Sequence, residues 1–581
     1  MPAAAAIATA AAGVALAAVV AFLVVGVRSG PVDWGELLTS SVWDPAGGRF
    51  GATAMVFGTA AVAAVALALA APVGWAAAVA IVELAPPRRR RALRAGAELL
   101  AVVPSIVYGL VGIAYLRPFV SDLAGVPGGD SLVTAGLVLA VMILPTIVAV
   151  SADALAEVPA TWREAAAAGG LTRSEVIRRA VLPSARRGMG AAAMLALARA
   201  LGETIAVFLV VGRADGRFPS GLADVAGRLV RPGQTLTTKL NGPESVLAGS
   251  SGAHWAALCA LGLLLLAAVV ALTVVGQRRS SHEGTGGRAL LRRGRVRSVA
   301  WGRMARDRVA RALAAGALGA VLLLVAAMAV AVLSRAGAAL DPGFWTARST
   351  GASGGGIRDQ LAGTLVLVGV AGLLAGPVGL GLGLVLAEYA GGRTARWLRA
   401  LTLTLGSVPS IVLGLWGYWF FGTQLGWGKS WLAGSVVLAV LAVPPVVVAV
   451  SAALAALPAE RREAALGVGL RRVQLVRSVL VPQAVPGLVT GLLLGLARAA
   501  GETAPLLFTA TVFSGAPTLP TGVTDSPVAA LPTHIFTLAQ DAADPAAVRT
   551  AWGAALALVA VAGLLVLAAV PARRRLDQRT A

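Results

Sequence analysis

Two copies of one short segment place arginine and glutamate inside otherwise apolar stretches of the chain. The pattern Ala-Arg-Ala-x-Gly-Glu-Thr occurs at 198–204 and again at 497–503. The planar guanidinium of arginine suits an oxyanion, and a glutamate carboxylate accepts a hydrogen bond from a protonated oxyanion. The expected site therefore takes three residues from each copy: Arg199, Glu203 and Thr204, and Arg498, Glu502 and Thr503.

The first arginine of this set lies deep in its apolar run. Arg199 is about eleven residues from the start of the run, or roughly 16 Å at ~1.5 Å per residue. Ionisable groups at such depth are costly and usually face a bundle interior or a water-filled path. Glu203 follows four residues later and is expected inside the same helix, on the same face. We therefore expect a substrate path. The alternative is that arginine and glutamate neutralise each other and only hold helices together.

A second repeated motif lies on the amino-terminal side of each Arg–Glu segment. Its pattern is Glu-Ala-Ala, three residues, Gly, nine residues, and then apolar-x-apolar-Pro. Two short helices broken at the glycine can present a knob to a soluble partner at the membrane face. A capping box with Thr161 is the alternative role for the first glutamate. The residues expected to couple the chain to this partner are Glu164, Ala165, Ala166 and Gly170, and Glu463, Ala464, Ala465 and Gly469.

A third repeated motif, Val-Pro-Ser-Ile-Val, begins at Val103 and at Val408. Proline kinks or breaks a helix, and a serine hydroxyl can satisfy a carbonyl that the break frees. The candidate hinge residues of a gate are Pro104 and Ser105, with Pro409 and Ser410. A fixed kink is the other interpretation, and these residues alone favour it.

The elements that position these motifs form two homologous halves. Glu164 maps to Glu463 and Arg199 to Arg498 at an offset of 299 residues, a period too long for a solenoid. The chain has 581 residues, of which 57% are hydrophobic and only 13% are charged, whereas a soluble domain is about a quarter charged. The sequence therefore predicts an all-α polytopic membrane protein whose halves pack about a pseudo-two-fold axis.

Apolar runs of about 20 residues, the length that crosses a bilayer, predict twelve spans, six in each half. They lie near 4–27, 55–82, 98–119, 131–152, 188–212 and 254–276, and near 310–333, 361–388, 400–421, 431–453, 486–511 and 552–570. The first run is interpreted as a retained helix, because it lacks the basic start of a signal peptide. The expected domains are 1–277, an Arg- and Gly-rich linker 278–308, and 309–581, with membrane-spanning cores at about 55–276 and 360–570.

The arginines predict the orientation. With the N-terminus inside, 34 of the 49 Lys and Arg residues fall in inner loops, so both termini and both Glu-Ala-Ala motifs are expected in the cytosol. The net charge of +22 then reflects topology and a linker that lies on membrane lipid, not nucleic-acid binding. The single cysteine and three scattered histidines predict neither a disulfide nor a metal site. Long outer loops suit docking of an extracytoplasmic protein, or they simply cap the helix ends.

The two repeated motifs resemble those of type I ABC importer permeases. The Arg-Ala-Leu-Gly-Glu-Thr segment at 199–204 is similar to the PstC-type subunit of the bacterial high-affinity phosphate importer, and the segment from Arg498 to Phe508 is similar to its PstA-type subunit. The resemblance implies transport of inorganic phosphate across the plasma membrane. It also implies a cytosolic ATP-binding subunit homodimer and an extracytoplasmic phosphate-binding protein as partners. The departure from the family is the fusion of its two subunits in one chain.

No cofactor is expected on this chain, since the resemblance assigns ATP and Mg to the partner ATPase. The segment Gly422–Ser430 resembles a P-loop, but Thr423 stands where glycine is required. The chain is therefore not expected to be an enzyme by itself. Three alternatives remain: a permease for sulfate or molybdate, an ion-coupled secondary transporter, and a membrane sensor that reports phosphate through a kinase.

Overall fold

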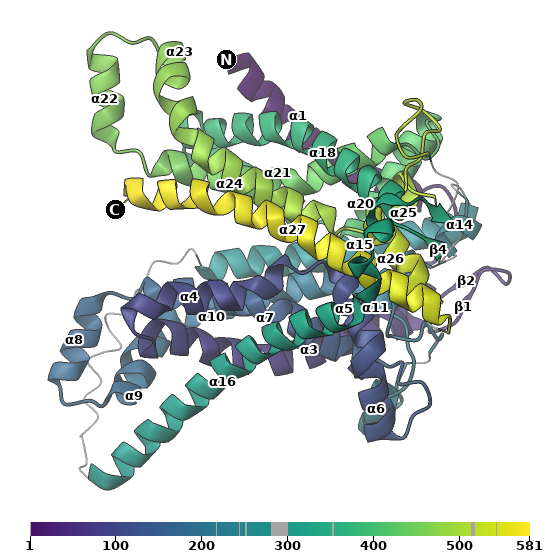
Figure 1. Ribbon diagram of the computed structural model, residues 1–581, viewed down its shortest axis with the longest axis horizontal. Coiled ribbons are helices and arrows are strands. Elements are labelled where there is room, and N and C mark those ends of the chain that lie inside the picture. The colour runs from purple at the N-terminus through teal and green to yellow at the C-terminus, as the bar shows by residue number, and fades with distance from the viewer. Residues whose placement is uncertain are drawn as a thin grey trace.

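The computed structural model of the chain is built almost wholly from helices (Figure 1). It describes residues 2–580 except for gaps at 217, 243, 250–251, 281–299, 351–353, 513–516 and 542, so most of the expected linker 278–308 lies outside the described residues. The strands that it describes form two short antiparallel pairs, β1 (Trp43–Asp44) with β2 (Arg49–Phe50) and β3 (Ser349–Thr350) with β4 (Gly354–Gly355). The predicted all-α class is confirmed.

Ten helical segments in the described ranges are long and apolar enough to cross a membrane, and one bent pair of helices is an eleventh candidate. Each half contributes five of the ten. The helices that form them are α1 (Pro2–Val27), α3 (Thr53–Val79), α5 (Ser105–Val111) with α6 (Arg117–Ala124), α7 (Leu132–Ala156), α15 (Gly252–Ser280), α16 (Ala300–Arg335), α18 (Arg358–Leu384), α21 (Trp431–Ala455), α24 (Val481–Ala500) and α27 (Pro545–Thr580). The chain is therefore a multi-pass membrane protein.

The twelfth expected span corresponds to α10 (Leu182–Gly202), which matches α24 in the other half. Arginines near both ends of α10 make it less apolar than the other spans. The expectation that Glu203 lies inside this helix is wrong, because α10 ends at Gly202 and the Glu203 backbone is extended (φ −73°, ψ 129°). In the second half, α24 likewise ends at Ala500. A short helix follows each break, α11 (Ile205–Phe208) and α25 (Ala504–Thr509).

The two halves exchange their first helices. Helix α1 of the first half packs against α18 of the second half, and α16 of the second half packs against α3 of the first. Within each half, glycines allow two long helices to pack closely, α3 with α7 in the first half and α18 with α21 in the second. A Cβ added at Gly74 of α3 would lie 2.7 Å from the Ile147 side chain of α7, and one added at Gly379 of α18 would lie 2.4 Å from Val446 of α21. The fold is thus duplicated in its packing as well as in its sequence.

The third span of each half is broken at the Val-Pro-Ser motif. In the second half, α19 (Gly392–Ser407) and the helical segment Ser410–Gln424, which begins with α20 (Ser410–Gly417), meet at 87°. In the first half, α4 (Pro87–Glu98) and a 3₁₀ turn precede Pro104, and α5 follows it. The carbonyl of Leu100 at this break accepts a hydrogen bond from the Tyr108 hydroxyl at 2.5 Å. Tyr108, rather than Ser105, therefore satisfies that carbonyl.

The Glu-Ala-Ala motifs and the outer loops lie at opposite ends of the molecule (Figure 1). We call residues 160–176 and 459–475 the EAA loops; they hold α8 (Ala160–Ala168) with α9 (Arg173–Val176), and α22 (Ala459–Gly467) with α23 (Arg472–Leu475). The opposite end carries β1–β4 and six short helices: α2 (Trp34–Thr39), α12 (Leu222–Leu229), α13 (Leu236–Leu240), α14 (Glu244–Leu247), α17 (Pro342–Thr346) and α26 (Leu531–Gln540).

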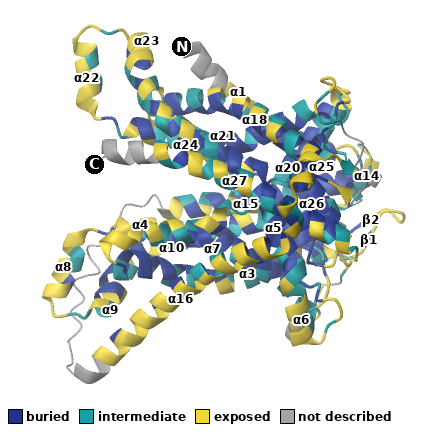
Figure 2. Cartoon of the chain, in the orientation of Figure 1, coloured by how far each residue is buried: buried dark blue, intermediate teal, exposed yellow. Residues whose placement is uncertain are grey.

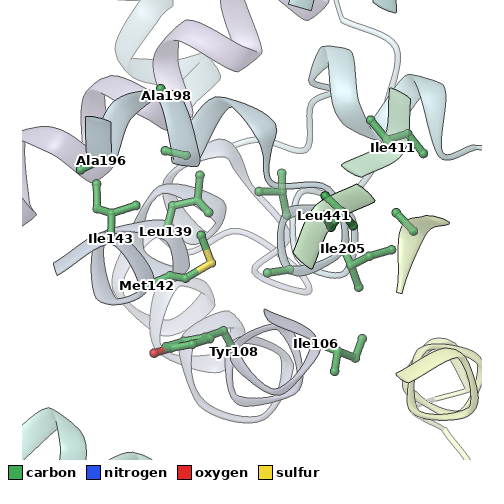
Figure 3. Close-up of a cluster of buried hydrophobic side chains, with 14 of the residues drawn as sticks. Ile106, Tyr108, Leu139, Met142, Ile143, Ala196, Ala198, Ile205, Ile411 and Leu441 are labelled. Atoms are coloured by element: carbon green, nitrogen blue, oxygen red, sulfur yellow. The ribbon is translucent and has the colours of Figure 1, made fainter. Parts of the chain in front are cut away.

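Buried residues concentrate where the two halves approach each other, around α5, α11, α20 and α26 (Figure 2). Figure 3 shows part of this core, in which Ile106, Met142 and Ile205 of the first half share one cluster with Ile411 and Leu441 of the second. Ala198, the neighbour of Arg199, belongs to the same cluster. The first Arg–Glu segment is therefore attached to the buried core that both halves share.

Candidate functional site

The two arginines sit in matching places, each in the last turn of its helix, Arg199 on α10 and Arg498 on α24. A cation is favourable there because the helix carboxyl end carries partial negative charge. Both side chains are exposed, and that of Arg498 is 44% accessible. Alanines on both sides of each arginine are buried. Each helix thus packs its alanine face and turns its arginine to an accessible space.

Charges from both halves act on one another at this place. Arg199 interacts electrostatically with Glu203 in its own half and with Arg498 and Glu502 in the other. The Nε of Arg498 lies 3.9 Å from a Glu502 carboxylate oxygen, too far for a hydrogen bond. In the described part of the chain, the Arg199 guanidinium forms no ion pair within 4.0 Å. The two arginines and two glutamates are thus close enough to influence one another, and the one ion pair described among them, Arg498–Glu502, is long. Their role in a substrate path stays a prediction.

The break after α10 holds Glu203 from two sides. Its carboxylate interacts with the Ser105 hydroxyl and accepts a hydrogen bond from the Ala206 amide at 3.4 Å. Its backbone carbonyl accepts a hydrogen bond from the Thr237 hydroxyl of α13 at 2.9 Å. Sequence reasoning missed Thr237, because the contact joins residues far apart in the chain. Ser105, a candidate hinge residue, also contacts a charged residue of the site.

The two threonines of the site are buried rather than accessible, with exposures of 1% each for Thr204 and Thr503. The Thr204 hydroxyl donates to the Gly202 carbonyl at 3.4 Å. The Thr503 hydroxyl has no hydrogen-bond partner among the residues that the structure describes. Thr503 therefore has an unused hydrogen-bond donor close to the junction of the halves. Unpaired buried hydroxyls are uncommon in folded proteins.

Each Val-Pro-Ser motif contacts the Arg–Glu segment of the opposite half. A Cβ added at Gly501 would lie 2.8 Å from Cβ of Pro104, and one added at Gly202 would lie 3.7 Å from Cα of Pro409. The two contacts are reciprocal, since Pro104 and Gly202 belong to the first half and Pro409 and Gly501 to the second. The candidate hinges and the candidate substrate residues therefore form one junction between the halves.

The EAA loops present their glutamates to solvent. Glu164 and Glu463 are exposed, as are Ala165 and Ala464 beside them, whereas Ala166 is buried and Ala465 is half-buried. Gly170 and Gly469 take positive φ values of 76° and 85° after the first helix of each loop, a conformation that favours glycine. The helix that carries Glu164 is preceded by Pro159 and has no side-chain cap. The capping role with Thr161 is therefore not seen, and each loop is an exposed helix-turn-helix.

An ion pair that the sequence reasoning missed ties each EAA loop to the second span of its half. Arg163 lies 2.8 Å from the Glu83 carboxylate, and it also donates to the Leu155 carbonyl at 2.8 Å. Arg462 lies 3.0 Å from Glu388 and donates to the Leu454 carbonyl at 2.7 Å. Glu83 and Glu388 occupy matching places in the repeat, and an arginine directly precedes each Glu-Ala-Ala motif. Those two repeated charges were the available signal.

At the opposite end, a buried lysine belongs to a charged cluster that holds the outer loop of the first half against Trp43 and His254. Lys239 is 2% exposed and lies 2.8 Å from the Glu244 carboxylate, which also accepts from the Trp43 indole at 3.1 Å and contacts His254 at 2.7 Å. Partial burial opposes ionisation of Glu244, but the hydrogen bonds from Lys239, Trp43 and His254 outweigh it and hold its pKa below the usual value. This cluster fixes the loop by charge as well as by packing.

The sequence was compared with known proteins. The model of the family "Binding-protein-dependent transport system inner membrane component" matches residues 70–281 and again residues 379–581. A phosphate transport system permease protein PstC of Mesorhizobium japonicum is 36% identical over 249 residues, 40% of this chain and 73% of the relative. A phosphate transport system permease protein PstA 2 of Mycobacterium tuberculosis is 41% identical over 243 residues, 42% of this chain and 79% of the relative.

A third relative is a probable ABC transporter permease protein, YqgH of Bacillus subtilis, which is 37% identical over 247 residues. Each relative corresponds to less than half of this chain, and the family model occurs twice in it. The similarities therefore fit a fusion of a PstC-like and a PstA-like permease. With two matches that together cover more than half of its residues, this chain belongs to the family of binding-protein-dependent transport system inner membrane components.

Proposed function

We propose that this chain is the permease of an ATP-driven importer of inorganic phosphate, with its EAA loops and both termini in the cytosol. One observation carries the proposal: each Arg–Glu segment contacts the Val-Pro-Ser motif of the opposite half, and both arginines are accessible. The relatives named as phosphate transport permeases support the choice of substrate.

The proposed path runs between Arg199 and Arg498. A guanidinium presents parallel donors to an oxyanion. Among the described residues Arg199 forms no ion pair, and Arg498 lies 3.9 Å from Glu502 without a hydrogen bond to it. Phosphate keeps a proton at neutral pH and sulfate does not. Glu203 and Glu502 could therefore accept a hydrogen bond from phosphate, whereas they would repel sulfate. The buried, unpaired Thr503 hydroxyl would add one donor on the side of the second half once the junction opens.

The gate in this proposal is the junction of glycine and proline between the halves. Pro104 and Gly501 touch across it, as do Pro409 and Gly202 with more room. If the halves rock against each other, these two contacts change at once. The accessible arginines and the separation of the EAA loops in Figure 1 support an arrangement that opens toward the EAA-loop end.

The force that rocks the halves comes, in this proposal, from a cytosolic ATPase homodimer that binds ATP and Mg. Exposed Glu164 and Glu463 can pair with cations on that partner. The Arg163–Glu83 and Arg462–Glu388 ion pairs then join each EAA loop to the second span of its half. On the outside, the loop fixed by Lys239 and Glu244 belongs to the surface on which a phosphate-binding protein would dock.

The experiment is labelled phosphate uptake into vesicles that contain this chain, a cognate ATPase and the binding protein, with ATP inside and sulfate or molybdate as competitors. Uptake that needs ATP and is unaffected by sulfate or molybdate would support the proposal. ATP-dependent uptake of sulfate instead would keep the permease and change its substrate. Phosphate uptake without ATP would favour a secondary transporter, and partner binding without any uptake would favour a sensor.

A further inference from the structure

A cavity of about 640 Å³ lies between the first half and α16 of the second half, near the EAA-loop end and away from the Gly–Pro junction. Its walls come from α3, α10, the π-helical turn before α10, and the amino-terminal part of α16. Figure 1 shows that part of α16 running beside α9. The lining residues include Trp75 and Val79 of α3, Leu182 and Met189 of α10, and Ala310 and Leu313 of α16. No residue of the proposed substrate path lines it.

Two of these walls change from basic to apolar in the same direction. Along α16, Arg306 and Arg311 come before Leu313, and along the approach to α10, Arg178 and Arg179 come before Leu182 and Met189. Both segments run from the EAA-loop end into a span. The cavity therefore has a cationic end toward the EAA loops and an apolar end toward the spans.

The lining of the cavity carries an excess of positive charge. Four arginines line the cavity against one glutamate, Glu175, whose carboxylate already accepts the Thr172 amide at 2.9 Å. Arg311 is neutralised by Asp307 at 2.7 Å. Arg178, Arg179 and Arg306 are exposed, and no ion pair joins them to a carboxylate within the described ranges.

We propose that this cavity binds one anionic phospholipid of the membrane leaflet on the EAA-loop side. Basic pockets between spans at that surface recognise anionic headgroups, and the apolar interior accommodates the first part of the acyl chains. The volume lies in the range of pockets that enclose a small molecule. It fits a headgroup with the upper part of its chains. The lipid would bridge α16 of the second half to α10 of the first, beside α9 of the EAA loop.

The test is a titration of the purified full chain with phosphatidylglycerol or phosphatidylcholine, followed by native mass spectrometry. We expect one phosphatidylglycerol to be retained in preference to phosphatidylcholine. A basic residue near an anionic lipid surface contributes roughly five-fold in affinity. A triple variant Arg178→Gln, Arg179→Gln and Arg306→Gln should therefore weaken retention on the order of 100-fold.

The matched control removes three exposed arginines from α4, which carry the same charge but do not line the cavity: Arg88→Gln, Arg89→Gln and Arg91→Gln. Equal losses in the two triple variants would mean general attraction to anionic lipid and would overturn the site. Displacement of the lipid by equimolar inorganic phosphate would also overturn it, because the cavity would then bind free phosphate.

A second pair of variants tests the apolar interior without changing charge. Both Ala310 and Ala312 are exposed on α16, but only Ala310 lines the cavity, so Ala310→Trp obstructs it and Ala312→Trp adds the same bulk outside it. We expect Ala310→Trp to release phosphatidylglycerol while every arginine remains, and Ala312→Trp to retain it. Retention of the lipid by Ala310→Trp would place it outside the cavity and refute the proposal.

Discussion

Gly501→Ala should disturb the junction between the halves, whereas Gly202→Ala, its counterpart, should be tolerated. The difference lies in the space that each new Cβ meets. At Gly501 the Cβ would lie 2.8, 3.2 and 3.4 Å from the Cβ, Cα and Cγ atoms of Pro104. At Gly202 the three nearest atoms, all of Pro409, lie 3.7 to 4.0 Å away. Carbon atoms attract each other best at about 3.5–4.0 Å, so only the first substitution produces a clash.

Backbone strain does not enter, because Gly501 has φ −88° and ψ −6°, a conformation open to alanine. Overpacking of a tight contact costs about 1–3 kcal/mol. That cost would lower the population of the observed junction about 5- to 160-fold. The proline ring is rigid and belongs to the other half, so relief requires the halves to separate locally.

The assay compares both variants with the unchanged chain in two measurements. Purified protein gives the thermal unfolding midpoint, and vesicles with the ATPase and binding protein give the rate of phosphate uptake. We expect Gly501→Ala to lower the midpoint and to change uptake, with Gly202→Ala close to the unchanged chain in both. If the two variants behave alike, or if Gly202→Ala is the more disturbed, the reasoning from this junction fails.

Three further predictions concern charge. Arg199→Gln or Arg498→Gln should lower uptake about 10- to 100-fold, because a hydrogen bond to a charged group contributes about 1.5–3 kcal/mol. Co-purification of the ATPase should remain, and normal uptake by both would contradict the proposed path. Arg163→Gln should leave the Glu83 carboxylate, which is 10% exposed, without its cation, at a cost of about 1–3 kcal/mol. The thermal unfolding midpoint of Arg163→Gln should fall, and adding Glu83→Gln should restore part of the loss. An unchanged midpoint in Arg163→Gln would show that the ion pair does not stabilise the fold. Because the pKa of Glu244 is lowered in the folded protein, its stabilisation is full above pH 4.5 and is lost as pH falls through the lowered value. Thermal unfolding from pH 7 to 3 should show this loss in the unchanged chain but a smaller loss in Glu244→Gln, and parallel pH profiles would contradict it.

Much of the architecture could be predicted because it is written in local composition and in repetition. Apolar length identifies spans, and the 299-residue offset of Glu164 and Arg199 from Glu463 and Arg498 reveals the duplication. The duplicated family match and the helical structure confirm that architecture. The exposure of the EAA glutamates agrees with their expected place on a surface. Their role toward an ATPase stays a prediction, as do the domain boundaries.

What the sequence could not supply depends on contacts between distant residues. The helix breaks at Gly202, although local propensity predicts that the apolar run continues as one helix. The Glu203 carbonyl beyond the break accepts a hydrogen bond from Thr237, which belongs to an outer segment. The contact of Gly501 with Pro104 joins residues almost 400 positions apart. Such contacts arise only once the halves have packed, so no periodicity in the chain signals them.

The exchange of first helices has a consequence for biosynthesis. Helix α1 leaves the ribosome first, but its partner α18 begins at Arg358, about 330 residues after α1 ends at Val27. At roughly 5–20 residues per second, α1 must wait on the order of 15–65 s in the lipid before that partner is made. Helix α16, by contrast, emerges when α3 is already inserted. Assembly of the fused chain is thus ordered in time: α16 can pack against α3 as soon as it is made, whereas α1 can pack against α15 early but meets α18 only later.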